Sequence, residues 1–147
     1  MSNEITRNTT LQWSKGGASA AVNVSEKITQ VGNNIIENVQ IISDGSEQIN
    51  LGDVTTPKYI VFKNMTPTWG SLTAAEKVAS GFTGNTAESD YIAAHSVHIG
   101  NISPADSENT PFKLDPSNGV SLVTAQTSWY AIASNFDVNL LVFAIEG

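Results

Sequence analysis

Apolar residues concentrate in two segments of the chain, one in its first half and one at its end. The segment 136–146 first alternates between polar and apolar residues and then becomes apolar at consecutive positions. The segment 59–64 is also apolar at consecutive positions over most of its length. Strands that are apolar on both faces are typical of central positions in a covered sheet. The pattern therefore predicts two core strands, the second of which closes the fold.

Shorter β-prone segments, each bounded by turn residues, fill much of the remaining chain. The first two, 5–13 and 18–24, flank Lys15-Gly16-Gly17, a turn signal, and are predicted to be a pair of strands. The others are 33–42, 48–51, 112–114, 120–123 and 128–133. Short strands at roughly ten-residue spacing are typical of a β-sandwich or jelly roll. We therefore expect an all-β, single-domain antiparallel β-sandwich or jelly roll over residues 1–147.

The middle of the chain, at about 66–111, departs from this rhythm and is predicted to be an excursion from the scaffold. Thr73 and Glu76 have capping-box spacing, and Gly81 stands where the C-terminal cap of a helix belongs. One short surface helix is expected between them. We expect a polar loop at 84–90, a strand at 91–101 and a second loop at 102–111.

The composition limits the classes of partner. Charged residues make up 14% of the chain, against about 25% in typical soluble proteins, whereas Ser, Thr and Asn number 16, 14 and 14. The formal charge of -7 argues against nucleic acid, because binding to phosphates requires clustered cations. The chain has no cysteine, which excludes disulfides, thiolate metal sites and a cysteine nucleophile.

Neither a secretory signal nor a membrane span is predicted. Residues 1–7 place an acid before their single base and precede no apolar core. No segment approaches the roughly 20 apolar residues that a membrane-spanning helix needs. We therefore expect no membrane partner and synthesis in a cytoplasm.

Residue types suited to catalysis or metal binding occur, but no pattern joins them. His95 and His98 lack the further ligands that a structural zinc site requires. Ser96 beside His95 and near Asp90 provides the residue types of a serine hydrolase, without a nucleophile elbow.

The acidic residues are equally unspecific. Asp106 and Glu108 lie in a polar loop, where nothing apolar would raise a pKa for glycosidase chemistry. With Asp115 they could ligate calcium, although the alternating calcium-loop signature is absent. We expect no enzyme activity, no cofactor and no metal.

The aromatic residues are the best candidates for contacts with a partner. Trp69 lies beside Pro67 and Gly70 at a loop entrance, and Trp is enriched at interfaces. The full set of interface candidates is Trp69, Trp13, Tyr91, Trp129 and Tyr130. With Tyr59, the same aromatic residues could instead form a platform on which a sugar stacks.

Several of these segments together resemble a protein family. The stretch 49–64 combines a Leu-Gly-Asp turn and a Thr-Thr-Pro connection with an apolar strand that ends in Asn64. It resembles a motif in small accessory virion proteins of tailed bacteriophages, and 112–123, 129–133 and 138–146 resemble the second half of that pattern. The match covers about half of the chain, and the segment 66–111 is longer than the pattern.

The resemblance implies a structural protein of the phage particle, made in the host cytoplasm and located in the virion. Such a protein would self-associate, as a homo-oligomer that we expect to be a trimer. It would dock on the major capsid protein or other virion proteins, as a head decoration (cement) protein, a fibre base or a tail component. The alternative is a carbohydrate-binding or host-receptor-binding β-sandwich module.

Overall fold

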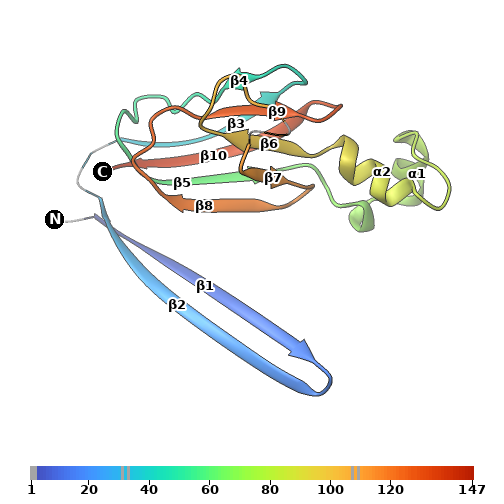
Figure 1. Ribbon diagram of the computed structural model, residues 1–147, viewed down its shortest axis with the longest axis horizontal. Helices are drawn as coiled ribbons and strands as arrows, with labels where there is room; N and C mark the ends of the chain where they lie inside the picture. Colours follow the sequence, from blue (N-terminus) through green and yellow to red (C-terminus); the bar gives the residue numbers. More distant parts are fainter. Residues whose placement is uncertain (1–2, 31, 33, 107, 109) are drawn as a thin grey trace.

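The body of the protein is a sandwich of two four-stranded antiparallel sheets (Figure 1). This computed structural model describes residues 3–30, 32, 34–106, 108 and 110–147. In order across the first sheet, which we call the long sheet, the strands are β3 (Ile35–Ile42), β10 (Val138–Glu146), β5 (Pro57–Asn64) and β8 (Gly119–Val123). The short sheet has the order β4 (Glu47–Gln48), β9 (Tyr130–Ala133), β6 (Val97–Gly100) and β7 (Phe112–Leu114). The expected all-β sandwich is confirmed.

The two strands predicted to be central lie side by side inside the long sheet. β10 pairs with β5 on one side and with β3 on the other, both antiparallel. Its inward residues Leu140, Val142 and Ala144 are fully buried against the short sheet. Phe62 of β5 meets Trp129 from the opposite layer with ring centroids 5.4 Å apart, in an edge-on contact. The core therefore forms between the sheets, around the last strand of the chain.

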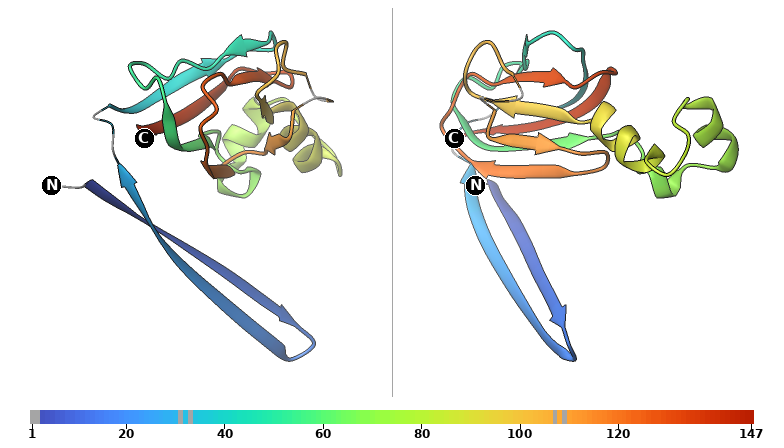
Figure 2. Two further views of the ribbon diagram at one scale, coloured as in Figure 1. Left: turned by 60° about the vertical axis from the view of Figure 1, so that its left-hand side comes forward. Right: turned by 45° about the vertical axis from the view of Figure 1, so that its right-hand side comes forward.

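The first two strands form a long hairpin that belongs to neither sheet. β1 (Asn3–Lys15) pairs with β2 (Ala18–Gln30) over thirteen residues. Gly16 and Gly17 connect them with φ of 59° and 84°, the positive values that a type I′ turn requires at both central positions. The predicted pair of strands is confirmed, but Figures 1 and 2 show it extending away from the sandwich. At about 3.4 Å per residue it is about 44 Å long; we call it the arm.

The middle excursion is more helical than the sequence suggested. It contains a 3-10 turn, η1 (Trp69–Ser71), and two helices, α1 (Ala74–Ala79) and α2 (Ala87–Ala94), beyond one end of the sandwich (Figure 2). The predicted capping box is present, with Thr73 Oγ1 accepting from the Glu76 amide at 3.3 Å and Glu76 Oε2 accepting from the Thr73 amide at 2.7 Å.

The predicted strand at 91–101 and loop at 84–90 are wrong over residues 87–94. These residues form α2, and only Val97–Gly100 is a strand. Ala87, Tyr91 and Ala94 are buried at the i, i+4, i+7 spacing of a helix face. The alanines favour the helix, and the window 91–101 joined its last turn to a separate short strand.

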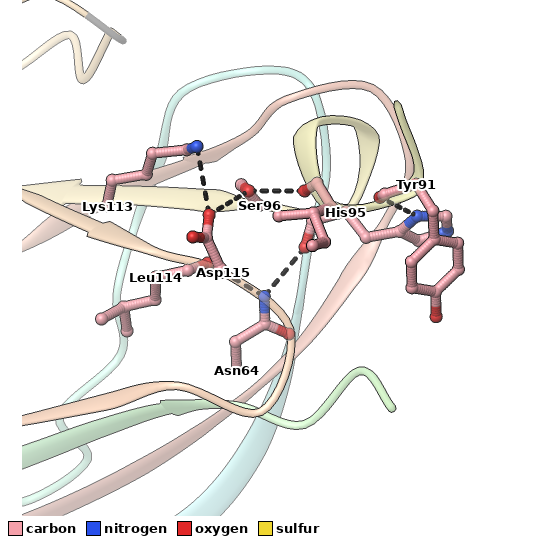
Figure 3. A network of polar contacts seen from close by, with 8 residues as sticks. Asn64, Tyr91, His95, Ser96, Lys113, Leu114 and Asp115 are labelled. Atoms are coloured by element: carbon pink, nitrogen blue, oxygen red, sulfur yellow. Dashed lines mark hydrogen bonds and ion pairs between the residues drawn. The ribbon is translucent and has the colours of Figure 1, made fainter. Parts of the chain in front are cut away.

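Asn64, at the end of β5, ties the excursion to both sheets. Its side chain is fully buried, and Nδ2 donates to the carbonyl of His95 at 2.8 Å and to that of Leu114 at 3.1 Å (Figure 3). Its Oδ1 accepts from the Thr66 amide at 3.0 Å. One side chain thus links the long sheet to the junction between α2 and β6 and to the end of β7.

We predict that Asn64→Ala lowers the free energy of unfolding by about 2–3 kcal/mol, because it leaves buried backbone groups without their partners. Urea denaturation followed by tryptophan fluorescence measures this. Asn139→Ala is the matched control, since Asn139 is exposed on β10 and its loss should change stability by less than about 0.5 kcal/mol. Equal effects for the two variants would refute the structural role of Asn64.

Candidate functional site

The arm has one apolar face and one polar face. Residues opposite each other in an antiparallel pair share a face, and the register places Ile5 opposite Ile28, Arg7 opposite Glu26, Thr9 opposite Val24 and Leu11 opposite Val22. Glu4, Thr6, Asn8 and Thr10 and their partners Thr29, Lys27, Ser25 and Asn23 form the other face. Leu11, Val22 and Val24 remain 66%, 54% and 51% exposed. The apolar face is therefore largely uncovered.

At its base, the same apolar face packs on the long sheet. Ile28 is buried in a small cluster with Tyr59 and Ile145, and Ile5, Val61 and Phe143 pack against that cluster. The sheet residues of this cluster lie on the outer face of β5 and β10, opposite to the core. Beyond Ile5 and Ile28, the Arg7–Glu26 pair at 3.6 Å separates this contact from the exposed part of the arm.

Exposed aliphatic residues, interspersed with a few polar ones such as Glu37 and Lys63, occupy the rest of the long-sheet face that points away from the core. The register continues it from β10 onto β3, where Ile35 lies opposite Ile145, Val39 opposite Leu141 and Ile41 opposite Asn139. Ile35, Val39 and Ile41 are 56%, 55% and 65% exposed. Contiguous apolar surface of this kind marks interaction sites more often than isolated exposed residues do. The outer face is the face of the long sheet that points away from the core, and it runs from Ile35, Val39 and Ile41 on β3 across β10 to Val61 on β5 and Val123 on β8.

A second feature is a cluster of aromatic rings in the excursion. Tyr91 lies at its centre, with ring centroids 5.3 Å from Trp69, 5.8 Å from Phe82 and 4.2 Å from His95. The Tyr91 hydroxyl donates to the carbonyl of Pro67 at 3.0 Å, and burial together with the charge of Glu76 raises its pKa. The cluster holds η1 against α2.

Beside this cluster is a cavity of about 240 Å³. Its lining includes Thr68, Trp69, Glu88, Ile92, Asp115 and Asn118. One aromatic side chain thus stands among hydroxyl, carboxylate and amide groups, a composition that suits a small polar ligand with an apolar face.

The structure distributes the predicted interface residues over different environments. Trp129 and Tyr91 are buried, whereas Trp69 and Tyr130 are half-buried. The backbone of Trp13 pairs with that of Ala20 near the tip of the arm, and its side chain lies outside the described residues. The arm and the outer face expose aliphatic residues, which the choice of aromatic candidates missed. Pairing 5–11 with 22–28 across the two glycines would have revealed the apolar face of the arm.

Of the residues considered for hydrolysis, Ser96 and His95 are each bonded to groups other than one another. The Ser96 hydroxyl is buried and lies 2.6 Å from the carbonyl of Ile92 and 2.8 Å from Asp115 Oδ1 (Figure 3). His95 Nδ1 lies 2.9 Å from the carbonyl of Tyr91, so the neutral ring donates from Nδ1. These groups hold the junction between α2 and β6 together.

Asp115 carries the charge of this network. Lys113 Nζ lies 3.1 Å from its Oδ1. Burial raises the pKa of Asp115, but hydrogen bonds from Ser96 and Lys113 and the charges of Lys113 and His98 outweigh that effect, and the pKa lies below its usual value. For His98, burial and the charge of Lys113 lower the pKa, against the opposing effect of Asp115.

Neither a cluster of metal ligands nor a membrane-spanning helix occurs in the described part of the chain. Within it, no three His, Asp or Glu side chains are grouped so that they could hold a metal ion. Among the same residues, no helix has the length and apolar character needed to cross a membrane.

Comparison with models of known protein families, with curated proteins and with solved structures finds no significant match.

We predict that Ser96→Ala lowers the thermal unfolding midpoint more at pH 6 than at pH 3. The Ser96 hydroxyl helps to keep the pKa of Asp115 below its unfolded-state value, so its contribution is complete above that value and is lost as pH falls through the lower folded-state pKa. Calorimetry of both proteins across this range measures the difference. A loss that is the same at both pH values would show that the hydroxyl does not favour the charged carboxylate.

Proposed function

We propose that this protein is a non-enzymatic structural virion protein of a tailed bacteriophage, which self-associates and docks on the particle, most simply as a capsid decoration protein. The observation that carries the proposal is the arm. Its apolar face is exposed at Val24, Val22 and Leu11, although the base of the arm packs on a folded body. A surface of this kind stabilises the protein only when another molecule covers it.

The body supports the same proposal. The outer face adds a second apolar surface on a rigid sheet, which is suited to holding a partner in a fixed geometry. The polar groups that could have served chemistry, such as Ser96 and Asp115, are instead bonded to each other and to neighbouring backbone and Lys113. The resemblance of residues 49–64, 112–123, 129–133 and 138–146 to accessory virion proteins is the reason for proposing the phage particle as the partner.

The direct test is the composition of purified particles. We predict that particles banded on a density gradient, from a lysate in which this chain is made, contain it in a fixed ratio to the major capsid protein by quantitative mass spectrometry. Immunogold labelling should place it on the outside of the particle. Chain that remains entirely in the soluble fraction would contradict the proposal.

The cavity beside Trp69 favours a second candidate function, the recognition of a carbohydrate. Trp69 offers a ring for stacking, and Glu88, Asp115 and Asn118 provide hydrogen-bonding groups around it. Lys77 Nζ lies 5.1 Å from the centroid of the Trp69 ring, so the ring already contacts a cation beside the cavity. This function would suit a fibre or tail component that reads the host surface.

If this second function holds, a glycan from a panel should change the tryptophan fluorescence of the protein in a saturable way. Trp69→Ala should abolish that change, because it removes the stacking surface. Val78→Ala, on the neighbouring helix α1 where the side chain is 77% exposed, is the control and should bind as the unaltered protein does. If no glycan of the panel changes the tryptophan fluorescence, the carbohydrate function is excluded and the virion proposal remains.

A further inference from the structure

Two apolar surfaces of one copy are left uncovered at the same time. The exposed part of the arm carries Leu11, Val22 and Val24, and the outer face carries Val39 and Ile41. The arm leaves its base and runs away from the sandwich, so that its tip is far from its own sheets (Figures 1 and 2). Within one copy, the distal arm therefore does not cover the outer face.

We infer that the arm of one copy lies with its apolar face on the outer face of the long sheet of a second copy. This inference rests on the self-association proposed above and names the surfaces that produce it. The occupant is a second copy of this chain, and each copy both gives an arm and receives one, since each copy has one arm and one outer face.

The base of the arm shows that the two surfaces are compatible. Ile5 and Ile28, on the apolar face of the arm, already pack on Tyr59, Ile145 and their neighbours on the outer face. Leu11 and Val22 continue that face of the arm, while Val39 and Ile41 continue that face of the sheet. The proposed contact thus extends an existing one, with the same side-chain chemistry on both sides.

The distribution of charge agrees with a second copy as the occupant. Residues 3–30 contain two acidic and three basic residues, whereas the rest of the chain contains twelve acidic and four basic residues. An arm with a small positive charge therefore meets a body with a large negative one. On the outer face, Glu37 and Lys63 lie opposite Phe143 and Leu141 in the register, so the contact surface is itself nearly balanced.

The geometry of the long sheet leaves room for an arm. β3 is an edge strand of eight residues, so a second chain can approach both its outer face and its free edge. Arm exchange around a closed symmetry axis would cover every arm: two copies of a dimer exchange arms with each other, and in a trimer each copy places its arm on the next copy around the ring.

The test compares two double variants of the full chain that add the same charge to opposite faces of the arm. Leu11→Glu with Val22→Glu changes the apolar face, and Thr10→Glu with Asn23→Glu changes the polar face. Each pair lies directly opposite in the register. The apolar-face variant should dissociate at a concentration at least tenfold higher than the control by light scattering over a dilution series, because charges are placed in the buried contact.

A cross-linking experiment identifies the surface on the second copy. Because the chain has no cysteine, single cysteines report only the chosen positions. Val22→Cys in one tagged protein is mixed with Ile41→Cys in another, and a short bis-maleimide should join the two tags. Asn23→Cys, on the polar face of the arm, replaces Val22→Cys in the control and should give at least tenfold less of that product.

The outcomes separate this inference from the proposed function. Oligomers that survive the apolar-face charges, or cross-link equally from both arm faces, would overturn the arm contact while self-association stands. A chain that is monomeric alone but requires Leu11 and Val22 to enter particles would also overturn it, because the arm would then bind the capsid. A chain that is monomeric and absent from particles would overturn the inference and the proposed function together.

Discussion

The fold depends on a single constraint, which is that both faces of β10 are apolar and both must be covered. Its two neighbours, β3 and β5, come from the first half of the chain, so the long sheet is complete only when the last strand is in place. The short sheet covers one face through Leu140, Val142 and Ala144. The other face receives only the base of the arm, at Phe143 and Ile145. The remainder of that face continues onto β3, where Ile35, Val39 and Ile41 are exposed, and it is the surface on which the proposed self-association depends.

Buried polar contacts help to fix the excursion to this scaffold. Asn64 bonds to backbone groups on three segments that meet at one end of the sandwich, and Ser96 and Asp115 hold the start of β6 against the end of β7. Within the excursion, the rings of Trp69 and His95 pack against Tyr91 and hold η1 against α2. Buried polar networks of this kind specify one geometry when every member is satisfied, which is how a short helical segment can present Trp69 beside a shaped cavity.

The parts of this structure that the sequence predicted are those set by local chemistry. The turn at Gly16 and Gly17, the capping box at Thr73 and the two strands apolar at consecutive positions all depend on neighbouring residues. The helix at Ala87–Ala94 was missed because it is only eight residues long and a strand begins at Val97, so the pattern combined the two short elements into one predicted strand. The surfaces were missed for a different reason. Whether Val22 or Ile41 is covered depends on where the arm and the long sheet lie in space, and aromatic residues such as Trp129, chosen for their type, lie in the core instead.

The arm also bears on the order in which the protein folds and assembles. A two-stranded hairpin by itself is at best marginally stable in water, because it has no second layer on which to bury its apolar side chains. This one has such a layer only at Ile5 and Ile28, and the Arg7–Glu26 pair then separates that contact from Leu11 and Val22. The distal part of the arm therefore buries little apolar surface within this chain. If a partner covers that face as proposed, the ordering of the arm and the binding of the partner would form a single equilibrium, because the same contact would stabilise both.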